Sequence, residues 1–150
     1  LAAATGSRPA TAKHAREAER VLLRKVGLNP ANYRLADGSG LSLYNYLSAE
    51  AEVKLLRYAY QNENIFHHLY QALPIAGVDG TLKKRMRSTF TRNNVRAKTG
   101  TLTGISSLAG YCKAANEHWL CFAIINQGVM HARNAKNFQN RVCTILCAPN

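Results

Sequence analysis

The last third of the chain constrains the fold most, because the spacing of its apolar residues changes there from the period of a helix to the period of a strand. Three strand-length segments follow one another, at residues 95–102, 105–113 and 119–126. The connection at residues 114–117 is short enough for a hairpin, so these strands are predicted to pair antiparallel. Residues 133–147 come next with one apolar and one polar side, which predicts a helix lying on the sheet.

The first half of the chain has a helical period. A helix is predicted over residues 10–26, ended by Gly27, which readily adopts the left-handed conformation of a helix end. A second is predicted over 48–61 with Ser48 as its N-cap, and a third, shorter one over 65–73. The fold class is therefore α/β, an antiparallel sheet flanked by helices. The residues expected to face inward in the first and last helices are Ala15, Ala18, Leu22 and Val26, and Ala135, Phe138, Val142, Ile145 and Leu146.

Positive charge is concentrated in the middle of the chain. The chain carries 20 Lys and Arg against 8 Asp and Glu, and no acidic residue lies between Asp79 and Glu117. Such a field attracts polyanions, so peripheral contact with an anionic membrane or wall polymer is one interpretation, and a solvated basic face is the other. No zinc-finger or helix-turn-helix spacing accompanies the charge, so no specific nucleic-acid partner is expected. No apolar run reaches 18 residues, which excludes a membrane-spanning helix.

The cysteines show no metal-binding spacing. They lie in apolar segments without C-x-x-C pairs or histidines at zinc-ligand intervals, so no metal and no cofactor are expected. Buried thiols are one interpretation. A disulfide between the first two is another, because both are equally far from the midpoint between Asn116 and Glu117 in the predicted hairpin. The four are Cys112, Cys121, Cys143 and Cys147.

The tripeptide Lys98-Thr99-Gly100, followed by Thr101, lies on the first predicted strand. A lysine on a strand offers positive charge to an anionic ligand and makes neighbouring hydroxyl groups more acidic. Thr99 and Thr101 share a face of the strand by its two-residue period and can donate hydrogen bonds to a carboxylate. Gly100 leaves room for a ligand backbone, and the N–H of Thr101 is then free to face an oxyanion. A solvated lysine on an edge strand is the competing interpretation.

Two further motifs precede this strand: DGSGLS, which begins at Asp37, and LPIAGVDGTL, which begins at Leu73. Asp37 and Asp79 each precede a glycine, and loop shaping is preferred over acid–base chemistry as their role. His67 and His68 are neighbours, so on a helix their side chains diverge, which favours surface or structural roles.

The three motifs together resemble a known family. In the order DGSGLS, LPIAGVDGTL and AKTGTLTGISSLAGYC, the chain is similar to the C-terminal part of the D-alanyl-D-alanine carboxypeptidases of the penicillin-binding-protein-4 type, peptidase family S13. The resemblance runs from about Ala31 to the final helix. Three ordered motifs are much more specific than the tripeptide alone.

The resemblance implies a serine β-lactamase or DD-peptidase-like fold, with residues 1–150 forming the C-terminal part of the penicillin-binding, transpeptidase-like domain. It implies a serine D-Ala-D-Ala carboxypeptidase or endopeptidase that acts on peptidoglycan stem peptides through an acyl-serine, is inhibited by β-lactams and works in the periplasm or elsewhere outside the cytoplasm. Lys98 would be the catalytic cation. Thr99, Gly100 and Thr101 would bind substrate, and the Thr101 N–H would supply half of an oxyanion hole.

Two elements of that family are absent. No serine is followed by Lys at the third position or by Asn at the second, so neither Ser-x-x-Lys nor Ser-x-Asn is present. Both precede DGSGLS in the family, so the chain is expected to be a C-terminal piece, inactive alone and partnered by the N-terminal part of the same enzyme. The family often has a basic residue directly after DGSGLS where this chain has Leu43, which leaves stem-peptide specificity open. A non-catalytic basic module for anionic wall polymer or nucleic acid is the alternative.

Overall fold

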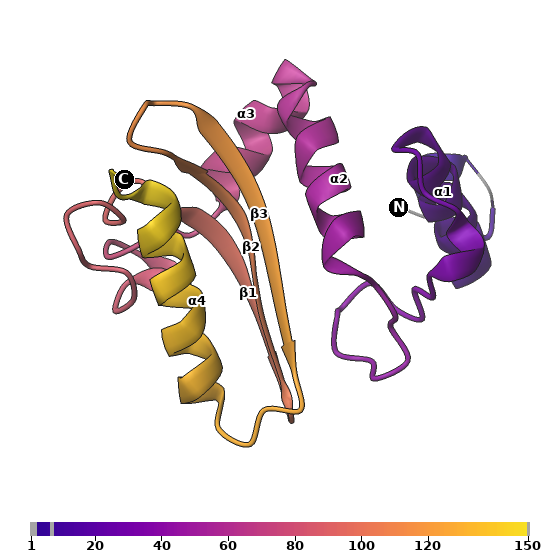
Figure 1. Cartoon of the computed structure of the whole chain (residues 1–150). Helices are drawn as coiled ribbons and strands as arrows, with labels where there is room; N and C mark the ends of the chain where they lie inside the picture. The colour runs from indigo at the N-terminus through magenta and orange to yellow at the C-terminus, as the bar shows by residue number, and fades with distance from the viewer. Residues whose placement is uncertain (1–2, 7, 150) are drawn as a thin grey trace. The chain divides into compact units, whose positions relative to one another are not determined.

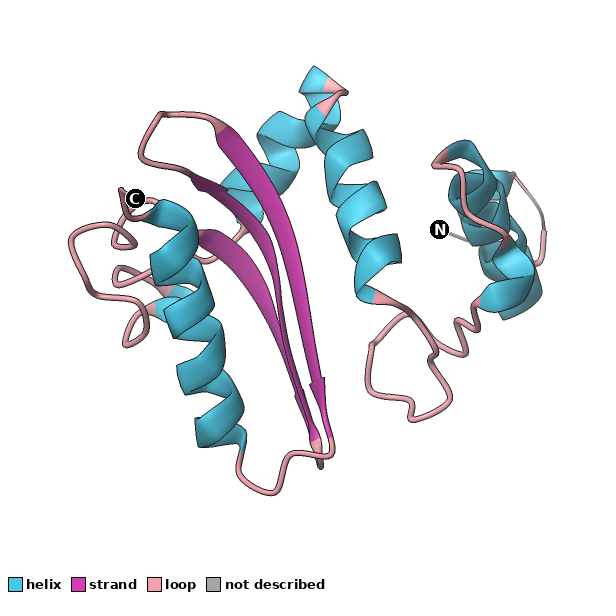
Figure 2. Ribbon diagram, in the orientation of Figure 1, coloured by secondary structure: helices cyan, strands magenta, loops and turns pink. Residues whose placement is uncertain are grey.

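The computed structural model describes residues 3–6 and 8–149 in two compact units, Leu1–Lys54 and Leu55–Asn150. The element order is helical, then strand, then helical, and the secondary structure in Figure 2 follows the order expected from the sequence. Each unit has its own apolar core. Within the described residues, no helix is long and apolar enough to cross a membrane.

The second unit is built on an antiparallel sheet of three strands, β1 (Arg96–Leu102), β2 (Ile105–Lys113) and β3 (Trp119–Gln127), in the order β1-β2-β3. The predicted strands are confirmed to within one residue at each end. Helix α4 (Ala132–Cys147) lies along one face of the sheet, and helix α3 (Glu63–Ala72) lies on the other (Figure 1). The predicted α/β architecture of an antiparallel sheet flanked by helices is therefore confirmed.

The face of the sheet under α4 carries the main core. Alternate residues of β2, including Leu108 and Cys112, are fully buried there and pack with Val95 and Ala97 against α4. The face of α4 that meets the sheet differs from the prediction. Its buried positions follow a four-residue interval: Ala135, Gln139, Cys143 and Cys147. Phe138 and Ile145, expected to face inward, are 53% and 73% exposed.

A buried polar side chain explains why α4 turns a different face to the sheet from the one predicted. Gln139 is fully buried because its amide nitrogen donates to Ser106 Oγ at 3.2 Å and to Asn126 Oδ1 at 3.0 Å, and its Oε1 accepts from Arg85 at 2.9 Å. A buried amide with its hydrogen bonds made costs little to desolvate. An apolar count along α4 therefore misses the stripe that faces the sheet.

The opposite face of the sheet carries aromatic rings. Phe66 of α3 makes edge-to-face contacts with Tyr111 of β2 and Trp119 of β3, with ring centroids 5.2 Å and 5.6 Å apart. Tyr111 is 1% exposed, and its hydroxyl donates to the carbonyl of Leu56 at 2.7 Å. Burial raises the pKa of Tyr111 to about 12. These contacts fix α3 on the face that α4 leaves uncovered.

Helix α1 (Ala12–Lys25) is the main element of the first unit, where helix α2 (Ala49–Tyr60) begins. Helix α1 is followed by Gly27 at φ +75°, and Ser48 caps α2 by accepting from the N–H of Ala51 at 3.2 Å, as predicted. Leu23 lies in the core and is 4% exposed, whereas Leu22, which was predicted to face inward, is 38% exposed. The prediction for α1 is therefore wrong at Leu22, and its neighbour Leu23 is the buried residue. Three short 3-10 turns complete the elements: Ala3–Thr5, Pro30–Asn32 and Gly80–Leu82.

Candidate functional site

Strand β1 is an edge of the three-stranded sheet, and its two halves differ in what lies beside them. Beside the first half runs the segment at residues 74–76. The N–H of Ala97 donates to the Pro74 carbonyl at 3.1 Å, and the N–H of Ala76 donates to the Val95 carbonyl at 2.9 Å. These bonds form an isolated antiparallel bridge between Ile75 and Arg96. The motif LPIAGVDGTL therefore closes the edge of β1 up to Ala97.

The second half of β1 turns open backbone groups outward. Because the N–H and C=O of Ala97 face the edge away from β2, the two-residue period of a strand turns those of Thr99 and Thr101 to the same side. A hydrogen bond of Lys98 is consistent with this orientation, because its ammonium donates to the outward-facing Thr99 carbonyl at 2.6 Å. The edge from Lys98 to Thr101 is thus a row of backbone groups available to an added strand.

The side chains of this row lie on both faces of the sheet. Lys98 is exposed and pairs with Ala109, whereas Thr99 and Thr101 pair with Leu108 and Ser106 on the face under α4. The shared face predicted for the two threonines is confirmed by this register. Thr99 Oγ1 donates to Thr81 Oγ1 at 3.1 Å, a contact between the strand and LPIAGVDGTL that sequence reasoning missed.

Gly100 has an internal reason to be glycine. A Cβ at this position would collide with Ser107 Oγ of β2, the residue directly opposite in the register. The missing side chain was predicted to leave room for a ligand backbone. The neighbouring strand alone is sufficient to exclude a side chain here.

The loop that closes the first half of β1 is shaped by an aspartate, as predicted. Asp79 Oδ1 accepts from the N–H of Ile75 at 2.6 Å, which folds residues 75–79 into a tight turn. Gly77 in this turn has φ +69°, and a Cβ there would lie 2.9 Å from Arg92 Cγ. A left-handed backbone without space for a side chain explains why the motif carries glycine at this place.

Arg85 links the same loop region to α4, a contact that no local sequence pattern predicts. Its Nε donates to Asn140 Oδ1 at 3.0 Å, and one terminal nitrogen donates to Gln139 Oε1 at 2.9 Å. Burial lowers the pKa of Arg85, although a guanidinium stays charged at neutral pH. One of the cations in the acid-free segment therefore has a structural role.

The DGSGLS motif forms a hydrogen-bonded loop in the first unit. Asp37 accepts from Asn45 Nδ2 at 2.9 Å, from Ser39 Oγ at 2.9 Å and from the N–H of Gly40 at 3.1 Å. These bonds lower the pKa of Asp37, and the bond from Asn45 has the largest effect on it. Loop shaping by Asp37 is thus confirmed, and Ser39 also stabilises the turn, because its Oγ accepts from the N–H of Leu41 at 3.1 Å. Leu43, which follows the motif, is 76% exposed.

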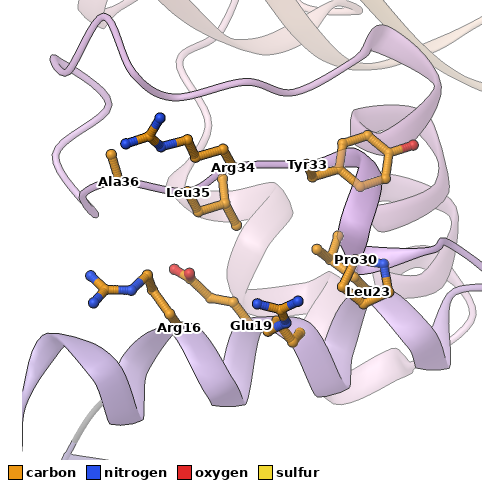
Figure 3. Close-up of a pocket in the computed structure, with 9 residues that line it drawn as sticks. Arg16, Glu19, Leu23, Pro30, Tyr33, Arg34, Leu35 and Ala36 are labelled. Atoms are coloured by element: carbon orange, nitrogen blue, oxygen red, sulfur yellow. The ribbon is translucent and has the colours of Figure 1, made fainter.

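A cavity of about 430 Å³ lies beside α1 in the first unit. In Figure 3, Arg16 and Glu19 of α1 point toward the segment that carries Arg34 and Leu35, and Leu23 and Pro30 lie beside each other at one end of the cavity. None of the residues predicted to carry chemistry lines it. Lys98 belongs to the other unit.

The register of the β2–β3 hairpin corrects one expectation. The strands pair Lys113 with Trp119, so the hairpin is centred on Asn116 and not between Asn116 and Glu117. Cys121 therefore lies opposite Tyr111, and it points to the other face of the sheet from Cys112. The predicted disulfide between Cys112 and Cys121 is wrong, because a shift of one residue reverses the face. All four cysteines are free thiols in the structure.

The open edge of β1 combines three properties that suit an extended anionic ligand. It offers outward-facing backbone groups at Thr99 and Thr101, hydroxyl groups on the same residues, and the positive charge of Lys98, whose ammonium binds the Thr99 carbonyl. Such an edge binds a peptide by strand addition. His67 and His68, by contrast, are exposed on α3, as predicted, but their side chains do not diverge: the rings meet edge to face with centroids 5.6 Å apart.

Comparison with known proteins gives a consistent set of matches. The model of the family described as D-Ala-D-Ala carboxypeptidase 3 (S13) matches residues 1–148. The D-alanyl-D-alanine carboxypeptidase DacB of Haemophilus influenzae is 39% identical over 117 residues, which cover 77% of this chain and 24% of that protein. The chain thus spans about a quarter of the length of this curated relative.

Solved structures agree with the fold. The crystal structure of penicillin binding protein 4 from Haemophilus influenzae in complex with a novel β-lactam superposes with a TM-score of 0.83 at 32% identity, covering 95% of this chain and 35% of that one. The extended spectrum β-lactamase TLA-1 superposes with a TM-score of 0.63 at 18% identity, covering 83% of this chain and 51% of that one. The second match is a likeness of fold alone.

Proposed function

The chain belongs to the D-Ala-D-Ala carboxypeptidase 3 (S13) family, and from that premise we propose that it forms the substrate-binding wall of a serine D-Ala-D-Ala carboxypeptidase or endopeptidase. The proposal rests on the open edge of β1 from Lys98 to Thr101. This is the edge that faces away from β2, and no described strand runs along it. Residues 1–150 are then the C-terminal part of the penicillin-binding domain, and the N-terminal part of the same enzyme supplies the nucleophilic serine.

Each residue of the edge has a role in this proposal. The substrate peptide adds to β1 as an antiparallel strand, and the Thr101 hydroxyl donates a hydrogen bond to its terminal carboxylate. Thr99 donates to the same carboxylate once its hydroxyl hydrogen turns away from Thr81. Lys98 is the catalytic cation between that carboxylate and the serine, where its charge stabilises the anion that develops during attack. Gly100 keeps this stretch of the edge free of a side chain. The Thr101 N–H donates to the oxyanion, and the acyl-serine is then released to water.

The same arrangement explains why β-lactams are expected to inhibit the enzyme. A β-lactam carries a carboxylate and a reactive amide, which suit the same hydroxyl donors and oxyanion site. A relative of known structure was solved in complex with a β-lactam. Peptidoglycan stem peptides are the proposed substrates, and the proposed place of action is outside the cytoplasm, where the cell wall lies.

Covalent labelling with a fluorescent penicillin tests the proposal. We expect the full-length protein to label and the chain of 150 residues alone to remain unlabelled. Lys98→Ala in the full-length protein should slow acylation by about 10²- to 10³-fold, the usual effect of removing one group that stabilises a developing anion. Lys84→Ala, which removes an exposed lysine outside β1, is the control and should label at the normal rate.

The backbone donor can be tested separately. Proline is tolerated on an edge strand where the N–H faces outward, so Thr101→Pro removes the donor without breaking the β1–β2 ladder. Thr101→Ala removes only the hydroxyl. We expect the proline variant to acylate far more slowly than the alanine variant, with similar circular dichroism. Equal acylation rates for the two variants, or a normal rate for Lys98→Ala, would contradict the assignment of β1.

A second function, adhesion to anionic wall polymer or membrane, is favoured by a separate observation. The two ion pairs among the described residues are Lys54–Glu50 and Lys113–Glu117, so the exposed cations of the acid-free segment have no carboxylate partner. These exposed cations are Lys83, Lys84, Arg87 and Arg92. Sedimentation with vesicles containing phosphatidylglycerol should fall steeply with salt, and it should fall for Lys83→Glu/Lys84→Glu. Binding that is insensitive to salt contradicts this function.

A further inference from the structure

Three of the four cysteines gather under α4. Cys112 is on the face of β2 that meets α4, and Cys143 and Cys147 lie one turn apart on the buried side of that helix. All three belong to the same apolar cluster and are no more than 4% exposed. Cys121 is partly exposed and lies on the opposite face of the sheet. Among the described residues, no group of three ligating side chains is placed to hold a metal ion.

Geometry selects one pair from these thiols. Side chains four residues apart on a helix have Cβ atoms about 5–6 Å apart, whereas a disulfide needs about 3.5–4.5 Å, so Cys143 and Cys147 do not suit each other. Cys121 is excluded as a partner because it lies on the face of the sheet opposite to α4. Cys147 is the nearer partner for Cys112. Helix α4 runs in the same direction as β2, and its Gln139 already meets Ser106 near the start of that strand, so the end of the helix lies beside the end of the strand (Figure 1). A hydrogen bond from the Cys112 S–H to Cys147 Sγ agrees with this placement.

The hydrogen bond also separates the acidities of the two thiols. It raises the pKa of Cys112, with burial adding to the effect, and it lowers the pKa of Cys147 because it stabilises the Cys147 thiolate. Cys143 has no such donor, and burial raises its pKa to about 12. Cys147 is therefore the member of the cluster best prepared to act as a thiolate nucleophile.

We propose that Cys112 and Cys147 form a disulfide that joins β2 to α4 when the protein folds in an oxidising compartment. The inference rests on the location outside the cytoplasm that accompanies the proposed function, because disulfides persist there. It does not depend on peptidase activity. The bond would close a loop that contains the whole of β3 and most of α4, and it would hold α4 on the sheet whose edge carries Lys98.

The chemistry is a two-step exchange with an acceptor disulfide, such as that of a thiol oxidase or of oxidised glutathione. The Cys147 thiolate attacks one sulfur of the acceptor, forming a mixed disulfide and releasing the first thiolate. Cys112 loses its proton, attacks Cys147 Sγ and displaces the second thiolate. The two cysteines lose two electrons, the acceptor becomes two thiols, and the two cysteine protons end on those leaving groups.

Peptide mapping of the full-length protein, folded with oxidised and reduced glutathione and then alkylated, tests the bond. Trypsin cuts after Lys98, Lys113 and Arg141, so Cys112 is released on residues 99–113 and Cys147 on a peptide that begins at Val142. We expect these two peptides to be linked in a non-reduced digest and free after reduction. Cys121, on residues 114–133, should be alkylated in both samples.

Variants distinguish the pair from its neighbours. Cys143→Ser should keep the cross-link, which identifies Cys147 as the partner, and Cys121→Ser is the matched control on the other face. Reductant should lower the denaturant midpoint of the wild-type protein but not that of Cys112→Ser or Cys147→Ser. Four alkylated thiols after oxidative folding, or a cross-link that disappears in Cys143→Ser, overturns the proposal even if penicillin labelling is normal. If the serine variants do not fold, fragmentation of the linked wild-type peptides decides, because it shows which of Cys143 and Cys147 carries the alkyl group.

Discussion

The two halves of β1 are continuous in sequence but opposite in environment. Around Ala97 the strand has β2 on one edge and residues 74–76 on the other, and Ala97 itself is fully buried. From Lys98 onward, β2 is the one strand that the structure places beside it, and Lys98 and Thr101 are exposed. The first half is therefore held by close contact on all sides, and the second half keeps its outward backbone groups for a ligand.

This difference teaches that the motif around Lys98 is not self-sufficient. The open edge begins where LPIAGVDGTL stops pairing, so the loop defines the site as much as the strand does. Substitutions in the closed half should thus reduce stability, whereas substitutions in the open half should reduce activity and leave the fold intact. The following four changes test that division, in order of expected effect.

Gly110→Ala should be the most damaging change. Gly110 pairs with Ala97, and a Cβ there would overlap the Arg96 carbonyl and lie 2.6 Å from Ala97 Cα, so the two strands would have to separate. We expect a loss of about 3 kcal/mol in the free energy of unfolding, at the upper end of the usual cost of overpacking.

Gly100→Ala is the matched change in the open half. It meets only the Ser107 side chain, and Ser107→Ala in the same protein should relieve it. Urea unfolding followed by circular dichroism measures both. If Gly110→Ala costs no more stability than Gly100→Ala, the two halves do not differ as described.

Asp79→Ala should weaken the closure of the first half. It removes the acceptor of the Ile75 N–H, and because Asp79 is exposed we expect a loss of about 1 kcal/mol, below the range for a buried hydrogen bond to a charged group. Asp79→Asn keeps an acceptor oxygen and should lose less. Hydrogen exchange at the Ala97 amide, which donates to Pro74, reports the opening directly. Unchanged exchange in Asp79→Ala would show that the turn does not hold residues 74–76.

Thr81→Val tests the link between the loop and the open half. It removes the hydroxyl that accepts from Thr99, and we expect about 0.5 kcal/mol less stability and about a twofold slower penicillin acylation. Thr81→Ser keeps the hydroxyl and serves as the control. An acylation rate that is the same in both variants would mean that the loop does not orient Thr99.

The smallest effect is expected from the titration of Asp37 in the DGSGLS loop. This loop lies outside the sheet and serves as a comparison with the two halves of β1. The folded pKa of Asp37 lies below its ordinary value of 3.8, so the loop is stabilised above that pH and loses this stabilisation as the pH falls through the folded pKa. The Asn45 side-chain amide signals in an NMR titration should therefore change with a midpoint below pH 3.8. Asp37→Asn should remove that change. A transition of these signals at a higher pH contradicts the lowered pKa.

The sequence was informative wherever a period or a motif carried the structure. Strand segments, helix order and the family were all predicted, because alternation in β2 and the glycine after α1 are local signals. The open row from Lys98 to Thr101 followed from the same alternation.

What failed were features set by long-range contacts. Gln139 faces the sheet because of Arg85, Ser106 and Asn126, which lie 13 to 54 positions away along the chain. The hairpin centre shifted by half a position and so reversed the face of Cys121, and no local pattern records such a shift. The pairing of residues 74–76 with β1 was equally invisible, since that segment is too short to have a period.

The pairing of residues 74–76 also gives the open edge a direction. A ligand strand that runs antiparallel to β1 points its carboxyl end toward Arg96, and there residues 74–76 already occupy the place of the next strand. The open edge is thus closed at one end, and a peptide strand on it can advance only until its last residue meets residues 74–76. Under the proposed function, the enzyme would select chain ends by counting residues from that stop, and a longer peptide would have to leave the edge of the sheet beyond Lys98.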